Sequence, residues 1–406
     1  MKRLIFNELI WSNVMKIAMI TYRGLPRGGV VHSSFLAEAL ARRGHQVTLY
    51  YIWHKARDGS EGKDFYRKLA VPAECVTYSG KEAEVNKGSV EGMAAALAKS
   101  LPNDYDIYHV HDAIGAAGVR KMKKRTGKLV WTIHHLEPYN DPELDAFFDT
   151  QIRAVDGHAT VSAYWQFVLK NKYGIFGRVI HNGVDLMKYH PKGDTTIWKE
   201  RLNFFDEQKK MLLYVGGLEP RKGLEYMLLT FEIVLRRVPQ TYLVVVGRSA
   251  VSSQPHEKDL IEILLDRTKT RNNVVFLDYV EDEDMPSLYS LAKMVVLTSR
   301  NEGWGLSLQE AMASGKPIGA FSVGGIPELV TNEFGILVPF GDAGSLAQGI
   351  VNVLKSSKRA KSMGKMARRR VEGFSWERSA KEAEFVYELL RRPPRRRGGP
   401  DEEGGS

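Results

Sequence analysis

Apolar positions recur along the chain as short runs that alternate with longer segments of helical spacing. The first run, KIAMITY from Lys16, is followed by the turn-rich loop RGLPRGG and then by VVHSSFLAEALARRGH, whose apolar residues have helical spacing. Farther along, YDIYHVH and KLVWTIHH are rich in β-branched and aromatic residues, as is typical of buried parallel strands. The pattern predicts α/β alternation.

The alternation restarts after the polar stretch KYHPKGDTTIWKERLNF. Here MLLYVGG, TYLVVVG, NVVFLDYV and MVVLTS are predicted strands, and LEYMLLTFEIVLRRV is a predicted helix. Two such series predict two doubly wound domains with a boundary near residues 185–200. Because doubly wound sheets bind ligands beyond the carboxyl ends of their strands, we expect the active site in the cleft between the domains.

Length and composition agree with two domains in a reducing, cytoplasmic setting. The chain has 406 residues, 43% of them hydrophobic, and its lone Cys75 cannot form an intramolecular disulfide. No Cys/His cluster has zinc-ligand spacing, and no apolar run reaches the roughly 18 residues of a transmembrane helix. Polar residues interrupt residues 1–14, which make a poor signal-peptide core. We expect them to be an upstream-start extension or a flexible arm, with Met15 opening the first strand.

The net charge of +10 favours anionic partners such as nucleotides, sugar phosphates, lipid headgroups or nucleic acid, without choosing among them. The basic residues are not interleaved with stacking aromatics and no nucleic-acid motif is present, which argues against nucleic acid. The run RKMKKRTGK at residues 120–128 is typical of a solvated helix end. Its alternative interpretation is peripheral contact with an anionic membrane.

The stretch NEGWGLSLQEAMASGKP sets two carboxylates, Glu302 and Glu310, around a Gly-Trp-Gly turn. On one continuous helix their backbones would lie about 12 Å apart, beyond the roughly 5 to 9.5 Å between the carboxyl groups of a glycosidase. The glycines favour a different arrangement, in which RNEGWG is the loop after a strand and LSLQEAMASG is the next helix. The N-terminus of such a helix favours an anion such as a diphosphate. The plain alternative is a solvent-facing loop glutamate and a helix-capping glutamate.

The region from Asn273 resembles the nucleotide-sugar-binding domain of the retaining GT-B glycosyltransferases, in particular family four (glycosyl transferases group 1). The hallmarks E-x-x-x-x-x-x-x-E, A-x-G-x-P, G-G-x-x-E and G-x-L-V-x-x-G-D stand here in order. Upstream, LLYVGGLEPRKGLEYML resembles the family's V-G-R-x-x-x-x-K-G segment, and VIHNGVDLMKYHP resembles its interdomain segment. FSWERSAKEAEFVYELL resembles the helix that crosses back to the first domain. The similarity covers roughly residues 15–390.

The resemblance implies an α/β GT-B fold, in which two Rossmann-like doubly wound domains face each other across a cleft. We expect an N-terminal acceptor-binding domain at residues 15–190 and a C-terminal nucleotide-sugar-binding domain at residues 200–372. The crossing helix is expected at residues 373–390. The tail at residues 391–406 is charged and rich in Pro and Gly, which predicts disorder.

In the C-terminal domain, the resemblance implies that Glu310 binds the nucleotide ribose and Glu302 binds hydroxyls of the donor hexose. Lys222 would place an ammonium against the leaving diphosphate, although a lysine at a helix start is otherwise a solvated residue. The sugar and phosphate site would be lined by the backbone of Gly303, Trp304, Gly305 and Leu306.

One family cation is missing, because the arginine of V-G-R is replaced by Gly217. Two arginines could substitute for it: Arg221, adjacent to the lysine of R-K-G, and Arg248, in VVVGRS. We hypothesise Arg221.

In the N-terminal domain, Gly28 and Gly29 resemble the family's G-G loop, where backbone approaches donor phosphate and acceptor. His134 matches the T-x-H position that faces the transferred sugar, although a lone histidine is more often structural. His111 and Asp112, in HVHD, are further cleft candidates, and Asp112 would orient a histidine or bind the acceptor.

The function implied by the resemblance is that of a hexosyltransferase. It would move a hexosyl group from an α-linked UDP-, GDP- or ADP-sugar to an acceptor hydroxyl on a saccharide, lipid or small molecule, with retention of anomeric configuration. No D-x-D-like metal motif stands at a strand end, so we expect metal-independent chemistry without a cofactor, the nucleotide sugar being the donor substrate. Some lipid-glycosylating family members meet anionic membrane through a basic N-terminal surface, which keeps peripheral contact at the inner face of the membrane open.

Two alternatives are a GT-B-shaped nucleotide-sugar epimerase, which needs no acceptor, and a non-catalytic nucleotide-sugar-binding protein. The missing arginine at Gly217 prompts the second.

Overall fold

The computed structural model describes residues 14–21, 28–54, 61–80, 86–139, 141–202, 209–247 and 255–392. The expectations for residues 1–13, for Arg248 and for residues 393–406 therefore lie outside the described residues.

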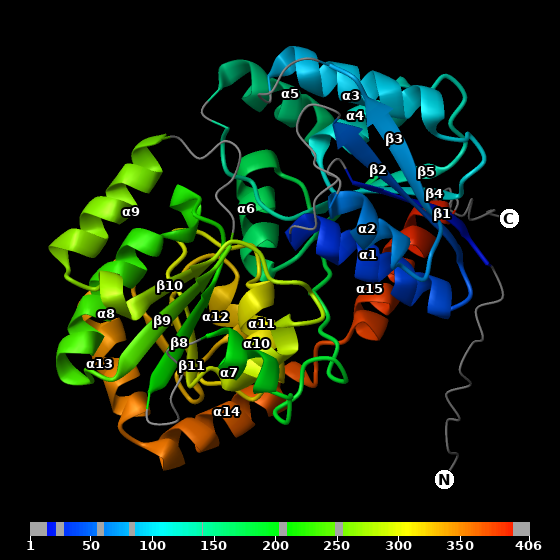
Figure 1. The fold of residues 1–406 in the computed structure, drawn as a ribbon. Coiled ribbons are helices and arrows are strands. Elements are labelled where there is room, and N and C mark those ends of the chain that lie inside the picture. The colour runs from blue at the N-terminus through cyan, green and yellow to red at the C-terminus, as the bar shows by residue number, and fades with distance from the viewer. Residues whose placement is uncertain are drawn as a thin grey trace, which may run out of the picture.

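The N-terminal domain is built on a seven-stranded parallel sheet with strand order β3-β2-β1-β4-β5-β6-β7 (Figure 1). Its strands are β1 (Lys16–Thr21), β2 (Gln46–His54), β3 (Ala73–Tyr78), β4 (Ile107–Val110), β5 (Lys128–Ile133), β6 (Gly157–Thr160) and β7 (Arg178–Val179). The helices between them are α1 (Gly28–Arg42), α2 (Glu61–Arg67), α3 (Lys87–Ser100), α4 (Ala113–Lys121), α5 (Pro142–Ile152) and α6 (Ala163–Tyr173).

The C-terminal domain has a six-stranded parallel sheet with strand order β10-β9-β8-β11-β12-β13. Its strands are β8 (Lys210–Val215), β9 (Thr241–Val246), β10 (Val274–Leu277), β11 (Met294–Leu297), β12 (Ile318–Phe321) and β13 (Gly335–Val338). Its α-helices are α7 (Thr196–Arg201), α8 (Leu224–Arg237), α9 (Pro255–Arg267), α10 (Met285–Leu291), α11 (Leu306–Ala313), α12 (Ile326–Leu329), α13 (Ala343–Leu354) and α14 (Ser357–Val371). Two 3-10 turns are η1 (Pro220–Lys222) and η2 (Arg271–Asn273). The predicted α/β fold with two Rossmann-like domains is confirmed.

Hydrophobic burial explains why the central strands are so apolar. Every residue of β4 and β11 is buried, because helices cover both faces of each sheet. At the edge of the N-terminal sheet, β3 buries Val76 alone among its six residues. Local sequence sets the helix ends: Ser162 caps the start of α6 through the backbone N–H of Trp165, and Gly174 ends it with a left-handed φ of 70°.

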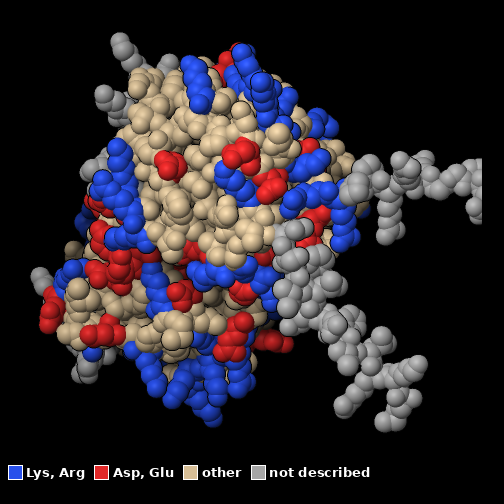
Figure 2. Space-filling model, turned by 90° about the vertical axis from the view of Figure 1, so that its right-hand side faces the viewer, with Lys and Arg blue, Asp and Glu red and all other residues tan. Residues whose placement is uncertain are grey.

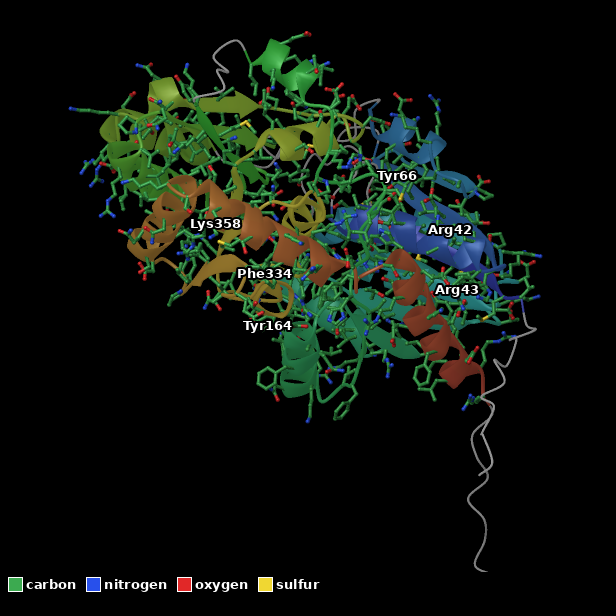
Figure 3. The ribbon with its side chains drawn as sticks, turned by 90° about the horizontal axis from the view of Figure 1, so that it is seen from below. Arg42, Arg43, Tyr66, Tyr164, Phe334 and Lys358 are labelled. Atoms are coloured by element: carbon green, nitrogen blue, oxygen red, sulfur yellow. The ribbon has the colours of Figure 1, made fainter. Side chains whose placement is uncertain are left out.

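The final helix α15 (Trp376–Arg391) returns to the N-terminal domain, as Figure 1 shows in red. It packs against α1, where Arg43 forms ion pairs with Glu377 and Glu384. In Figure 3, the labelled Arg43 marks this contact between α1 and α15. Tyr387 of α15 is fully buried in the core of the N-terminal domain. The last helix therefore ties the two domains together after the chain has left the first of them.

Positive charge is spread unevenly over the surface. Figure 2 shows Lys and Arg side chains gathered at the bottom of one face, over the C-terminal domain. In that domain, α14 has seven Lys or Arg residues and no Asp or Glu among its 15 residues. Among the described residues, no helix combines the length and the apolar character needed to cross a membrane.

The basic run at residues 120–128 spans the end of α4 and the start of β5. Two of its cations have local partners, since Arg120 donates to Gln151 at 2.7 Å and Arg125 pairs with Asp156 at 3.0 Å. The start of β5 lies at the amino edge of the sheet, opposite the edge where the cleft is expected. Membrane contact through this run stays a prediction, and it would not present the cleft to lipid.

Glu328 of the predicted G-G-x-x-E motif joins the two domains. Its carboxylate oxygens accept hydrogen bonds from the backbone N–H groups of Ala163 and Tyr164, both at 2.8 Å. These are the first two residues of α6, and Figure 3 labels Tyr164 where that helix begins. A glutamate of the C-terminal domain thus satisfies donors at a helix N-terminus of the N-terminal domain, where negative charge is stabilising.

We expect Glu328→Ala to lower the melting temperature by about 1–2 °C, because the loss of a helix cap costs about 1 kcal/mol. Scanning calorimetry measures the shift, with exposed Glu333→Ala as the control. Equal melting temperatures for the two variants would contradict a stabilising role for this contact.

Candidate active site

The predicted loop between β11 and α11 is present at the carboxyl edge of the C-terminal sheet. Gly305, the residue just before α11, has a left-handed φ of 96°, a conformation that favours glycine. At Gly303, an added Cβ would lie 2.5 Å from the carbonyl oxygen of His134 in the other domain. The two glycines therefore have different functions: one makes the turn, and the other lets the loop backbone contact the N-terminal domain.

Glu302 and Lys222 form an ion pair in this loop, with 2.8 Å between Oε2 and Nζ. Ser299 donates a hydrogen bond to the same oxygen at 3.1 Å, and Arg221 lies 3.8 Å from it. Burial alone would raise the pKa of Glu302, but the charges of Lys222 and Arg221 outweigh it and lower that pKa. Glu302 is therefore an anion that neutralises the lysine in the free protein.

Backbone geometry places Lys222 at this position. It ends the 3-10 turn η1, and the next residue, Gly223, has a left-handed φ of 67°. A Cβ on Gly223 would lie 2.1 Å from the carbonyl oxygen of Thr298, at the end of β11. The Lys-Gly pair of the R-K-G motif is thus explained by close contact with the loop that holds Glu302.

The structure also brings Arg221 to this site. Its guanidinium donates to the carbonyl oxygen of Asn301 at 3.3 Å and lies 3.7 Å from a carboxylate oxygen of Glu219. Its replacement of the arginine absent at Gly217 stays a hypothesis.

Glu310 lies in the second turn of α11 and accepts a hydrogen bond from the hydroxyl of Tyr289 at 2.8 Å. Burial raises the pKa of Glu310 to about 7, and the carboxylate of Asp282 adds to the effect. The two glutamates thus have pKa values shifted in opposite directions, because Lys222 and Arg221 outweigh burial at Glu302, whereas burial outweighs Lys188 at Glu310.

The predicted residues of the N-terminal domain face this loop. A Cβ on Gly29 would lie 3.6 Å from the ring of His134, and one on Gly28 would lie 4.0 Å from the side chain of Leu306. His134 is hydrogen-bonded to His111, with 3.1 Å between His134 Nε2 and His111 Nδ1. The structure therefore brings the predicted site residues of both domains together across the cleft.

Asp112 has a structural partner that the sequence analysis did not anticipate. Its side chain caps α4, accepting from the backbone N–H of Gly115 at 2.6 Å. Acceptor binding by Asp112 stays a prediction.

Sequence reasoning missed two histidines beneath the site, His32 and His109. His109 contacts the hydroxyls of Tyr387 and Thr132 at 2.6 and 2.7 Å, and its ring stacks on His111. The alternation Y-H-V-H was a usable signal, because residues two apart on a strand share a face. Burial lowers the pKa of His32 to about 4 and that of His109 to about 3, so both are neutral near pH 7.

A separate open pocket of about 590 Å³ lies between α2 and residues 281–284. Charged side chains line it, including the ion pair of Lys68 and Glu283 at 2.8 Å, and none of the predicted site residues reaches it. Among the described residues, no group of three or more His, Cys, Asp or Glu could hold a metal ion. Metal independence stays a prediction.

Comparisons with known proteins agree with the geometry of the two domains. Residues 195–370 match the family model of the glycosyl transferases group 1, and residues 26–188 match that of glycosyltransferase family 4. An uncharacterized glycosyltransferase of Methanocaldococcus jannaschii is 28% identical over 403 residues, covering 92% of this chain and 98% of its own. Spore coat protein SA of Bacillus subtilis is 27% identical over 396 residues, covering 93% and 100%.

Among solved structures, the HepE protein of Anabaena in complex with UDP-glucose has the same fold. Its TM-score is 0.78 at 22% sequence identity, covering 92% of this chain and all of the other.

The buried histidines predict acid sensitivity. Their folded-state pKa values lie below the ordinary 6.5, so the unfolded chain binds more protons below that pH, and stability falls between about pH 6.5 and 4. Glu310 opposes this, because its raised pKa contributes stability that is lost as pH rises from about 4.5 to 7. We expect the two histidines to outweigh the single glutamate, so that the melting temperature falls on acidification.

His109→Gln tests the origin of that sensitivity, because glutamine keeps a polar side chain but does not titrate. The free energy of unfolding should fall less between pH 7 and pH 5 than in the wild type, by up to about 1.4 kcal/mol per pH unit below 6.5, and the melting temperature should fall correspondingly less. Partly exposed His190→Gln is the control. An unchanged pH dependence in His109→Gln would contradict the explanation.

Proposed function

The chain belongs to the group 1 glycosyltransferases of GT-B fold, and from this premise we propose that it moves a hexosyl group from a nucleotide sugar to an acceptor hydroxyl with retention. One observation carries the proposal. Lys222, Glu302 and the N-terminus of α11 lie together, and they face Gly28 and His134 of the other domain. UDP-sugars are the first donors to test, since the similar HepE structure holds UDP-glucose.

Lys222 and the N-terminus of α11 supply the positive charge for the donor diphosphate. The ammonium is neutralised by Glu302 in the free protein. A bound diphosphate would compete for that ammonium, which releases the carboxylate of Glu302 to accept hydrogen bonds from hexose hydroxyls. Backbone N–H groups at the start of α11 would bind phosphate oxygens, where the helix dipole favours negative charge. Glu310, farther along the same helix, would bind the ribose.

The proposed reaction is a same-face substitution. The bond between the anomeric carbon and the phosphate oxygen breaks, and a bond from that carbon to the acceptor oxygen forms. The acceptor proton passes to the departing phosphate oxygen, so the nucleoside diphosphate leaves with it. Lys222 stabilises the charge that grows on the phosphate, and His134 borders the transferred sugar. The close contact of the two domains at Gly303 would help to exclude water from this space when the donor is bound.

The acceptor is a saccharide, a lipid or a small molecule carrying a hydroxyl. Peripheral contact with an anionic membrane through residues 120–128 is a separate proposal. Co-sedimentation with anionic liposomes that weakens as salt is added would support this proposal, and the absence of such binding would contradict it.

A thermal-shift screen of UDP-, GDP- and ADP-sugars, followed by transfer assays with the stabilising donor, tests the function. We expect one donor class to raise the melting temperature and to give a product whose anomeric configuration, read by NMR, is that of the donor. An inverted product would contradict retention. A new sugar formed from donor alone would indicate an epimerase, and binding without turnover across a broad acceptor panel would indicate a non-catalytic protein.

Lys222→Ala should lower kcat by about 10²–10³, because one charge that stabilises the transition state is lost. Arg221→Ala should lower it by about tenfold or more if Arg221 replaces the missing family arginine. Lys365→Ala, on the exposed face of α14, is the control. Near-normal turnover in Arg221→Ala would remove the hypothesis for that residue, and near-normal turnover in Lys222→Ala would contradict the mechanism.

A further inference from the structure

Four buried residues form a polar path from the N-terminal domain to the loop at residues 302–306, here called the donor loop. His32 Nδ1 lies 2.5 Å from Asn182 Oδ1. The carbonyl oxygen of Asn182 accepts a hydrogen bond from Gln309 Nε2 at 2.9 Å, and Gln309 Oε1 accepts one from Trp304 Nε1 at 3.0 Å. The relative exposures of these residues, in that order along the path, are 0%, 4%, 0% and 2%.

Each residue of the path belongs to a different part of the fold. His32 lies on α1, four residues after Gly28, and its ring packs edge-on against His134 with centroids 4.9 Å apart. Asn182 belongs to the segment that joins the two domains, and Gln309 lies on α11. The path therefore connects the N-terminal side of the cleft to the donor side.

Trp304 is the only large side chain between the two glycines of the donor loop. Gly303 and Gly305 have no side chains, so the indole ring adds an apolar anchor for the loop to the ion pair of Glu302 and the backbone contact at Gly303. The ring packs against His181 and Phe374, with centroids 4.6 and 5.1 Å away. These contacts hold the ring in place, and the bond to Gln309 also sets the direction of its N–H.

Gln309 is the residue on which the path depends. It accepts from one partner and donates to the other, both of them buried, so an apolar residue there would leave an indole N–H and a carbonyl without partners. An unsatisfied buried polar group costs more than its hydrogen bond contributes. The donor loop would shift to recover a partner for its indole.

We propose that Gln309 is a positioning residue, which fixes the donor loop through Trp304 and couples its placement to α1 through Asn182 and His32. The inference rests on the proposed function in that the loop binds the donor. Gln309 does not touch the reacting atoms. A displacement of about 1 Å at a site of this kind can lower turnover by about 10²-fold.

The test compares Gln309→Leu with Gln151→Leu. Gln151 is a matched control because it is also a buried glutamine, bonded to Arg120 at 2.7 Å, but it lies on α5 away from the cleft. Both variants should lose stability. Measured well below either melting temperature, kcat/KM for the donor should fall about 10- to 100-fold in Gln309→Leu and stay within about twofold of wild type in Gln151→Leu.

Hydrogen exchange without any substrate separates this inference from the proposed function. Amide exchange in residues 300–306 should be at least about tenfold faster in Gln309→Leu than in wild type, and unchanged in Gln151→Leu. If the wild type transfers no sugar, the proposed function fails, yet this exchange result still decides whether Gln309 positions the loop. Unchanged exchange in Gln309→Leu would overturn the inference.

Trp304→Phe provides a second, milder variant should Gln309→Leu fail to fold. Phenylalanine keeps an aromatic ring but removes the N–H together with one ring of the indole, so faster exchange in residues 300–306 is again expected. In the double variant Gln309→Leu/Trp304→Phe, kcat/KM should fall by less than the product of the two single losses, because both changes break the same hydrogen bond. Independent, multiplicative losses of kcat/KM would contradict the coupling.

Discussion

The contact between backbone and backbone at Gly303 is the constraint on which the site depends. The donor loop approaches the carbonyl oxygen of His134 so closely that a Cβ would lie 2.5 Å from it. On its other side, Gly325 packs against the carbonyl of Gly303, where a Cβ would lie 2.3 Å away. The loop is held between a strand end of one domain and a helix start of its own. A site that must exclude water and align a donor with an acceptor needs this closeness, which only glycine permits.

Charge is arranged around that contact so that the free protein stays neutral where the donor would bind. Glu302 occupies the position beside Lys222 that a donor phosphate would take. The pKa of Glu302 is lowered, so its side chain is ionised. At Glu310, burial outweighs the nearby Lys188 and raises the pKa to about 7. The histidines on the opposite wall are neutral because burial disfavours their charged form. Lys222 and Arg221 are thus the two cations that the structure brings beside Glu302.

Much of this could be predicted from the sequence, because it depends on local pattern. Apolar runs identified the central strands, and the glycines of NEGWG indicated a loop followed by a helix rather than one helix. The polar path could not be predicted, since its contacts join residues 150 and 127 positions apart in the sequence. Gln309 occupies a buried position of an apolar helix, where pattern alone indicates packing. The cap that Asp112 forms on α4 could have been predicted from its position just before a helix, but the sequence favoured orienting a histidine or binding the acceptor instead.

The central claim is that Lys222 and the donor loop form a diphosphate site between the domains. Calorimetric titration of the preferred donor's nucleoside diphosphate, and of the nucleoside alone, into wild type and Lys222→Met tests it most directly. The account predicts that the variant loses at least about tenfold in affinity for the diphosphate, equivalent to about 1.4 kcal/mol, and none for the nucleoside. Equal affinity of both proteins for the diphosphate would contradict it.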